Sequence, residues 1–340
     1  MKKNFSNNLP YIIGETSFNH QGDIDYLKKM IDEIADIGLD AVKFHLGINP
    51  KSRIQKNHPN LKNAIKMNFK ADQWDNIFSY TKRKNIDIIA LCNDVESIHY
   101  AIHKNVDAIE IHSTGLNDYF LLTESSKFKG LIILGIGGSS IEEIDYAVDF
   151  LRERDKKDII LMYGFQNYPT DYNNINISKM NKLHEMYKLP IGYADHTAYD
   201  DPNMEFISVM AAVLGFNILE KHYTLNFGEE RIDFEAAAGK KQMGDIKKLL
   251  NLVLKVRGDG SLEMSNPEIE YGKTGPMKKA IVARKKIMKG EILSIDNLWF
   301  KRTREETNIK QNQFMNLLGC KAIKDIEEDE IINHNNVNIK

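Results

Sequence analysis

Eight short apolar segments alternate with longer amphipathic segments over the first three quarters of the chain. They are rich in Ile, Val and Leu and lack strict alternation, which is typical of parallel strands buried on both faces. We therefore interpret them as eight β-strands. Their sequences are YIIGE (11–15), AVKFHL (41–46), DIIALC (87–92), AIEIHS (108–113), LIILGI (131–136), IILMYG (159–164), PIGYAD (190–195) and NILEKHY (217–223).

The intervening segments have a helical period. In residues 24–37 the isoleucines and leucine recur every three or four positions, which places them on one face of a helix. The same pattern predicts helices over 72–84, 95–104, 140–154, 176–188, 203–215 and 241–254. Strands that are each followed by a helix predict an α/β fold, a (β/α)₈ TIM barrel over residues 1–255. A doubly wound open sheet is the alternative, because strand order cannot be read from the pattern.

The alternation stops after residue 255. Residues 256–276 are rich in Gly, Ser and Pro and predict a linker between domains. Residues 277–340 predict a small β-rich domain, with turns at MKGE (288–291) and EEDE (327–330).

Composition narrows the kind of protein. With 42% hydrophobic and 28% charged residues the chain is typical of a globular protein, and its net charge of −2 gives no basic footprint for nucleic acid or an anionic membrane. No apolar run approaches the roughly 18 residues of a membrane span. The two cysteines lie far apart in the sequence, which argues against a disulfide framework. We expect a cytoplasmic protein that acts on small molecules.

A barrel places its active site at the carboxyl ends of the strands. The first strand ends at Glu15, with Asn19 close behind, and a carboxylate there could hold a substrate hydroxyl, act as an acid or base, or cap the next helix. The second strand contains Lys43, followed by His45. A buried lysine is costly unless it is paired or functional. Lys43 could bind a carboxylate or phosphate, form a Schiff base, or pair with a carboxylate such as Glu15 or Glu110.

Two histidines stand at the ends of the last two strands. His196 follows Asp195, and His222 comes two positions after Glu220. Neighbouring strand ends are close in a closed barrel, so the two imidazoles could bind one divalent ion together with water and substrate oxygens. Asp195 or Glu220 could orient them. The alternative is that the two histidines are unrelated polar residues.

Five segments, in this order, resemble the sialic acid synthase family over nearly the whole chain. Residues 12–45 resemble its opening, and PIGYADHTAYD (190–200) and VLGFNILEKHYTL (213–225) resemble its two histidine motifs. Residues 278–302 and 317–332 resemble its C-terminal antifreeze-like domain of the SAF type. The family condenses phosphoenolpyruvate with an N-acetylated hexosamine to give a nonulosonic acid. The resemblance therefore implies a carbon–carbon bond-forming transferase.

The resemblance also implies site residues and partners. It assigns a divalent metal, Mn²⁺ before Mg²⁺ or Zn²⁺, to His196 and His222, and implies a homodimer in which the small domain closes the partner's barrel. The residues implied as catalytic are Glu15, Lys43, Asp195 and Asp233. Those implied as substrate-binding are Asn19, His45, Glu110, Ser113, Gln166, Tyr168, Lys279 and Arg284.

The departures from the family pattern concentrate on the groups that hold phosphoenolpyruvate. Glu110 stands where the family has a lysine, and Lys279 aligns with an arginine that contacts the sugar. Hydroxyl-bearing stretches are replaced by residues 90–92, 135–137 and 164–166, and a serine by Ala194. Two alternatives therefore stay open: a metal-dependent aldolase or lyase that does not use phosphoenolpyruvate, and a non-catalytic sugar-binding homologue.

Overall fold

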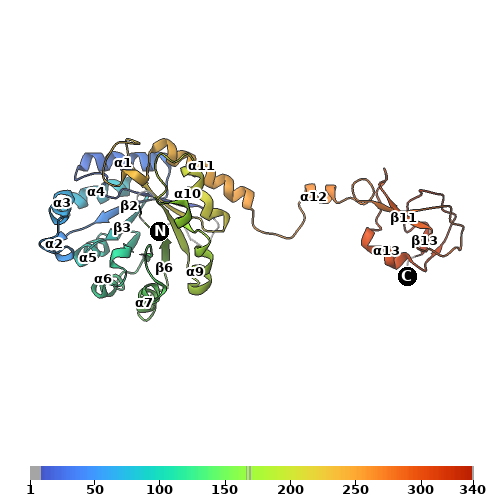
Figure 1. The fold of residues 1–340 in the computed structure, drawn as a ribbon, viewed down its shortest axis with the longest axis horizontal. Coiled ribbons are helices and arrows are strands. Elements are labelled where there is room, and N and C mark those ends of the chain that lie inside the picture. Colours follow the sequence, from blue (N-terminus) through green and yellow to red (C-terminus); the bar gives the residue numbers. More distant parts are fainter. Residues whose placement is uncertain (1–8, 166, 168–169, 339–340) are drawn as a thin grey trace. The chain divides into compact units, whose positions relative to one another are not determined.

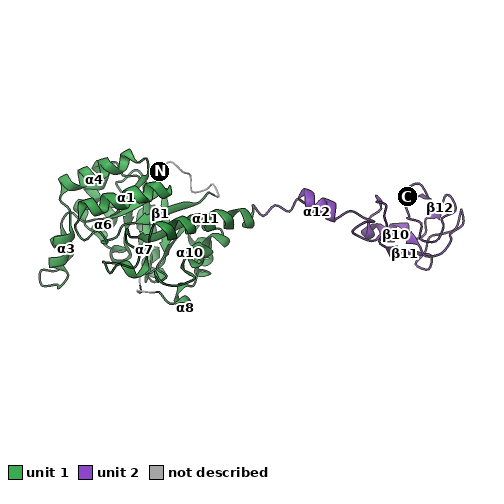
Figure 2. Cartoon of the chain, turned by 90° about the horizontal axis from the view of Figure 1, so that it is seen from above, with its two compact units in different colours: residues 1–258 green, residues 259–340 purple. Residues whose placement is uncertain are grey.

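The structure, a computed structural model, describes residues 9–165, 167 and 170–338. The chain divides into two compact units, residues 1–258 and 259–340, coloured separately in Figure 2. No helix among the described residues is long and apolar enough to cross a membrane. Each unit is described by itself.

The first unit is a closed parallel barrel. Its strands pair in sequence order, and β1 also pairs with β8, which closes the sheet and excludes the open-sheet alternative. The predicted TIM barrel is therefore confirmed. The strands are β1 (Tyr11–Glu15), β2 (Ala41–Leu46), β3 (Asp87–Cys92), β4 (Ala108–Ile111), β5 (Leu131–Gly135), β6 (Ile159–Tyr163), β7 (Ile191–Asp195) and β8 (Ile218–Tyr223), with the short β9 (Ala237–Ala238) beside β8.

Helices surround this barrel (Figure 1). The main ones are α1 (Ile24–Ile37), α4 (Ala71–Arg83), α5 (Val95–His103), α6 (Tyr119–Ser125), α7 (Ile141–Arg152), α9 (Lys179–Tyr187), α10 (Met204–Val213) and α11 (Lys240–Arg257). Short helices α2 (Pro50–Arg53), α3 (Leu61–Met67) and α8 (Tyr172–Ile175) and the 3₁₀ turns η1 (Ser113–Gly115) and η2 (Phe234–Ala236) lie in the connections. The hydrophobic period had not indicated α2, α3, α6 or α8, which are all of seven residues or fewer and therefore too short to show it.

The ends of α1 show how local sequence sets these elements. The carboxylate of Asp23 accepts the backbone N–H groups of Asp25 and Tyr26, which have no partner within the helix. Gly38 ends the helix with φ at 72°, a left-handed conformation that costs glycine little. Leu27, Ile31 and Ile34 are buried on the barrel-facing side, as their spacing predicts.

The barrel has two hydrophobic layers, one on the outer face of the sheet and one in its interior. The larger cluster lies between strands and helices and includes Leu27, Val42 and Ile88. A smaller cluster fills the barrel interior, with Ile13, Ala41, Ile89, Ala108, Ile133, Ile160, Met162 and Ala194. Side chains alternate between the two faces along each strand. The inward positions beyond this interior layer, toward the carboxyl ends of the strands, carry the polar residues of the site.

The second unit contains two antiparallel strand pairs with their own core. β10 (Ala280–Ala283) pairs with β11 (Leu298–Lys301), and β12 (Lys321–Ala322) pairs with β13 (Val337–Asn338). Its helical segments are α12 (Asn266–Tyr271), η3 (Gln311–Gln313) and α13 (Phe314–Leu317). The residues predicted as a linker, 256–276, include the last two residues of α11 and all of α12.

The two predicted turns of this unit have the same design. Glu291 accepts the backbone N–H of Met288 at 3.0 Å, and Glu330 accepts that of Glu327 at 3.0 Å. Asn297 and Asn336 each accept a backbone N–H three residues earlier, at 2.8 and 2.9 Å. Ile287 and Ile326 bridge the two copies. The unit is thus built from two similar turns around one small core.

Candidate functional site

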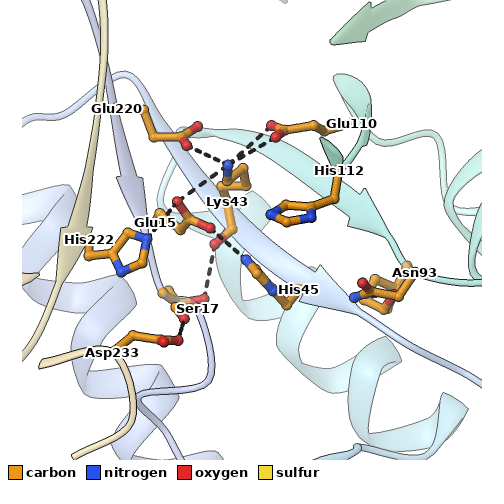
Figure 3. A network of polar contacts seen from close by, with 12 residues as sticks. Glu15, Ser17, Lys43, His45, Asn93, Glu110, His112, Glu220, His222 and Asp233 are labelled. Carbon is orange, nitrogen blue, oxygen red and sulfur yellow. Dashed lines mark hydrogen bonds and ion pairs between the residues drawn. The ribbon is translucent and has the colours of Figure 1, made fainter. Parts of the chain in front are cut away.

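Charged side chains from four strands meet inside the carboxyl-terminal end of the barrel (Figure 3). They are Glu15 of β1, Lys43 of β2, Glu110 of β4 and Glu220 of β8, and each is at most 3% exposed. Strand register brings them together, because Glu15 is level with Lys43, and Leu91 of β3 is level with Glu110. The predicted residues Glu15, Lys43 and Glu110 therefore share one site.

Lys43 is the centre of this cluster. Its Nζ lies 2.5 Å from Glu220, 3.2 Å from Glu110 and 3.3 Å from Glu15. Burial alone would favour the neutral amine, but the three carboxylates outweigh it and raise the pKa of Lys43. Glu15 and Glu110, the possible partners of the lysine predicted from the sequence, both contact it, and Glu220 is a third partner.

The carboxylates differ in how readily they ionise. Burial raises the pKa of Glu110 and raises that of Glu220 well above its ordinary value, although Lys43 opposes both shifts. Burial also disfavours the ionised form of Glu15, but Lys43 and His222 together hold the pKa of that carboxyl well below its usual range. Glu15 is thus the most readily ionised of the three partners of Lys43. The cluster has no surplus positive charge.

Glu15 also bridges two imidazoles. Its Oε1 lies 2.5 Å from His45 Nε2, and its Oε2 lies 3.3 Å from His222 Nε2. His45 in turn makes an edge contact with Phe18, with ring centroids 5.0 Å apart. The carboxylate is therefore fixed between Lys43, His45 and His222, and it borders the cavity described below.

The two predicted metal ligands lie side by side. His196 and His222 follow or end the paired strands β7 and β8, and their ring centroids are 5.0 Å apart. His196 Nδ1 lies 3.1 Å from the carbonyl oxygen of Ala194, which places the proton on Nδ1 and a lone pair on Nε2. Burial, and next the neighbouring His222, lowers the pKa of His196 to about 3, so the ring is neutral at pH 7.

This donor chemistry fits a divalent ion. Neutral imidazoles held by a second hydrogen bond are common ligands of such ions, and His196 meets this condition. His222 instead lies against Glu15, whose charge outweighs burial and raises the pKa of the ring. No group of three or more His, Cys, Asp or Glu side chains among the described residues is arranged to hold a metal. Metal binding by His196 and His222 therefore stays a prediction. The remaining positions would be left for water and substrate.

Asp195 faces the opposite side of the barrel wall. Its Oδ2 lies 2.8 Å from Lys221 Nζ and accepts the Ser208 hydroxyl at 2.6 Å, and its Oδ1 accepts the Thr197 hydroxyl at 2.6 Å. Lys221 also donates to the Thr197 carbonyl at 2.9 Å. The structure therefore does not bring Asp195 into the cavity but places it under the loop that carries His196. Its predicted catalytic role stays a prediction.

We expect Lys221→Met to destabilise the protein by about 3–5 kcal/mol, because it leaves the Asp195 carboxylate buried without its cation. The measurement is the free energy of unfolding in urea. Lys241→Met is the matched control, since Lys241 pairs with Asp245 on the surface and is 80% exposed, so no measurable change is expected. Equal stability of Lys221→Met and wild type would contradict this role.

Asn19 and Asp233 connect the loops after β1 and β8. The Asn19 amide donates to the Ile232 carbonyl at 3.1 Å and accepts the Thr224 hydroxyl at 3.0 Å. The Ser17 hydroxyl donates to the Asp233 carboxylate. Direct substrate contact by Asn19 and catalysis by Asp233 stay predictions, but both residues hold the loops beside His222.

Of the other predicted substrate-binding residues, only some lie in the first unit near this site. Ser113 lines the same cavity as Lys43. Gln166 and Tyr168 lie outside the described residues. Lys279 and Arg284 are exposed residues of the second unit, where the Arg284 guanidinium lies 4.8 Å from the centroid of the Trp299 ring.

The cavity at this site has a volume of about 250 Å³. One wall carries Glu15, Lys43, Glu110, Glu220 and His196, and the other is largely backbone and apolar, with Gly135, Gly137, Gly138, Met162, Gly164, Phe165 and Ala194. A Cβ at Gly164 would lie 2.1 Å from the Ala194 carbonyl oxygen, and φ there is +137°, so only glycine fits. The close approach of backbone explains why this wall has no side-chain hydroxyl at that position.

His112 was not singled out from the sequence. It follows β4, two positions after Glu110, and it lines both this cavity and a larger one of about 790 Å³ that is also bordered by Phe18, Arg53 and Asn93. Its place in the fourth strand segment, AIEIHS, was the available signal, because strand ends face the site.

A closed parallel barrel with buried charged side chains at the carboxyl ends of its strands defines a protein of the TIM-barrel enzyme class. Residues 30–261 match the NeuB family, and residues 278–338 match the SAF domain. The chain belongs to the NeuB family, as its motifs predict.

Relatives extend over nearly the whole chain. An uncharacterized protein of Methanocaldococcus jannaschii, MJ1065, is 31% identical over 95% of this chain and 93% of its own. The N,N'-diacetyllegionaminic acid synthase of Campylobacter jejuni is 29% identical over 94% and 98%. The crystal structure of an N-acetylneuraminic acid synthetase from Leptospira borgpetersenii, in complex with citrate, has a TM-score of 0.71 at 29% identity and covers 78% of this chain and 92% of that chain. These relatives give no support to an aldolase, a lyase or a non-catalytic homologue.

Proposed function

We propose that this protein condenses a three-carbon enol donor, phosphoenolpyruvate in the family, with an N-acetylated hexosamine aldehyde to form a nonulosonic acid. The methylene carbon of the donor bonds to the aldehyde carbon, one water is consumed and inorganic phosphate is released. The observation that carries the proposal is the position of Glu15, held between Lys43 and His222 at the mouth of a barrel of this family.

Each strand-end residue has a task in this reaction. Lys43 binds the donor carboxylate as a point charge, and Glu15 accepts hydrogen bonds from sugar hydroxyls and thereby orients the aldehyde. His45 keeps Glu15 in place through the 2.5 Å contact with its Oε1. Asp233 and Asn19 border the sugar through the loops they hold, and Ser113 faces the donor from η1.

A divalent metal, Mn²⁺ before Mg²⁺ or Zn²⁺, would be held by His196 and His222. When bound, such an ion polarises a carbonyl oxygen as a Lewis acid. The chain's own contribution is to present His196 as a neutral ligand with its lone pair on Nε2.

The test is an assay for 2-keto acid and phosphate release with Mn²⁺, phosphoenolpyruvate and a panel of N-acetylated hexosamines. Mass spectrometry would identify the nine-carbon product, and Glu15→Gln serves as a matched negative control that keeps the side chain's shape. No product from any acceptor in the panel, with metal bound at one equivalent, would contradict the proposal.

We further propose that the protein works in the cytoplasm as a homodimer in which the small domain of each chain, with Lys279 and Arg284, closes the partner's barrel. The support is the length of chain between residues 258 and 280, which contains the short helix α12. Even a flexible segment of about 20 residues spans roughly 25 Å. Small-angle scattering at micromolar concentration should give the mass of two chains. A monomer at that concentration would rule out this assembly.

A further inference from the structure

His112 lines the cavity but has no role in the proposed reaction as described above. It follows β4 beside Glu110, and it is the N-cap of the turn η1. It borders both the cavity at Lys43 and the larger cavity next to it. Among the described residues, Thr114 is the only other residue that lines both cavities. Figure 3 shows its ring beside Lys43 and His45. A side chain at this position can contact a ligand that extends from one cavity into the other.

The backbone fixes which nitrogen of the ring carries the proton. The Thr114 N–H donates to His112 Nδ1 at 3.2 Å, and the Thr114 hydroxyl lies 3.0 Å from the same atom. An Nδ1 that accepts an N–H must hold a lone pair, so the proton of the neutral ring is on Nε2. Among the described residues no side chain or backbone group forms a hydrogen bond to Nε2, which is left to meet a ligand.

The ring stays neutral beside Lys43. Burial, and next the neighbouring His45 and Lys43, lower the pKa of His112 to about 4. A neutral imidazole with an Nε2–H is a hydrogen-bond donor without a positive charge. It can therefore stand next to the ammonium of Lys43 without repulsion.

The part of the cavity that would hold the three-carbon substrate has few other side chains that can donate a hydrogen bond. The ammonium of Lys43 is already surrounded by three carboxylates, and Gly135, Gly137, Gly164 and Ala194 offer no side-chain donor. Among the described lining residues, hydroxyl or N–H donors on the β4 side come from His112, Ser113 and Thr114, and Thr114 is engaged with His112. For an anionic group of the substrate near Lys43, the His112 Nε2–H and the Ser113 hydroxyl are therefore the uncommitted side-chain donors on this side, among the described lining residues.

We propose that His112 is a specificity-determining residue that binds the anionic group of the three-carbon donor through Nε2–H. This inference rests on the proposed function, because it assigns a contact within the same reaction. A neutral hydrogen-bond donor at this position binds an anion without a second cation, the lysine that Glu110 replaces. Compared with a cationic side chain at this position, it gives a highly charged substrate less advantage over one of low charge, since it adds a hydrogen bond but no Coulomb attraction between full charges.

Kinetics of two variants test the assignment. His112→Phe keeps a planar ring but removes the N–H, whereas His112→Asn keeps an N–H donor. We expect His112→Phe to raise the KM for the donor by roughly 10- to 100-fold, the size of one hydrogen bond to a charged group, with the acceptor KM changed by less than about threefold. His112→Asn should restore part of the loss. Equal changes in both KM values, or no rescue by Asn, would overturn the inference.

Nitrogen-15 NMR of histidine-labelled protein gives a readout that does not depend on turnover. The free protein should show His112 with its proton on Nε2, and phosphoenolpyruvate added with Mg²⁺ should shift that resonance in wild type and in Glu110→Lys. A proton on Nδ1, or a His112 resonance that stays still while those of His45 or His222 move, would overturn the role of His112. Product formation with a still His112 would refute this inference alone, whereas absence of product refutes the proposed function.

Discussion

Replacing Glu110 by lysine should strengthen the binding of phosphoenolpyruvate by roughly 10- to 100-fold. Glu110 lies 3.2 Å from Lys43 and faces the same cavity, so in wild type it neutralises the cation that would hold the donor. Phosphoenolpyruvate carries close to three negative charges at neutral pH, given a second phosphate pKa near 6. A carboxylate beside it repels it, and each charge-assisted contact is worth about 1.5–3 kcal/mol.

The measurement is calorimetric titration of phosphoenolpyruvate into wild type and Glu110→Lys with Mn²⁺ present. Wild type should bind weakly. Glu110→Gln is the matched control, because it removes the negative charge without adding a positive one, and its affinity should fall between the two. Pyruvate, which has no phosphate, should gain less from the substitution. Glu15 and Glu220 remain beside both lysines, so a thermal melt close to that of wild type is expected.

Micromolar affinity in wild type that is lost on Glu110→Lys would show that the altered pocket still suits the trianionic donor. In that case Glu110 would be protonated or displaced when the donor binds, and the charge argument would be wrong. Tight binding in both forms would mean that Glu110 does not decide donor affinity.

Loss of either strand-end histidine should abolish metal binding and activity while the fold survives. His196 and His222 are the protein ligands of the proposed ion, and removal of one leaves a single imidazole, which is too few for stable binding of a divalent metal. Elemental analysis of purified His196→Ala, His222→Ala and the double variant should show less than a tenth of the metal found in wild type. Calorimetric titration with Mn²⁺ should show the same loss.

His99→Ala is the matched control for the metal experiment. His99 lies on the surface of α5, 57% exposed and paired with Glu124, so its removal should leave metal content unchanged. Circular dichroism of all variants checks the fold. Stoichiometric metal retained by the double variant would refute the assignment of these ligands.

The order of elements could be predicted from the sequence because it depends on local patterns. Strands such as β1, β2 and β3 match their apolar segments residue for residue, since parallel strands buried on both faces leave an unbroken hydrophobic run. The long helices match to within a few residues, because their buried faces repeat every three or four positions. The short helix α6 could not be found, since seven residues contain too few repeats of that period.

The candidate site could be predicted in its members but not in its contacts. The sequence placed Glu15, Lys43, His196 and His222 at strand ends and offered Glu110 as a possible partner of Lys43. It left open whether Lys43 pairs with Glu15 or Glu110, and the structure shows that Glu220, 177 positions away from Lys43, is the nearest of three partners. Such a distance in sequence carries no local signal, because it is set by closure of β8 onto β1.

What only the tertiary structure decided is the face on which each strand-end residue lies. Ala194 and Asp195 are neighbours in sequence, yet Ala194 borders the cavity while Asp195 pairs with Lys221 behind the wall. Along β8 the same alternation sends Glu220 and His222 inward and Lys221 outward. The sequence determines that side chains alternate, because successive residues of a strand point to opposite faces. Which of the two sets faces the cavity is fixed only when eight strands close with one register, since a shift of one residue would exchange the faces.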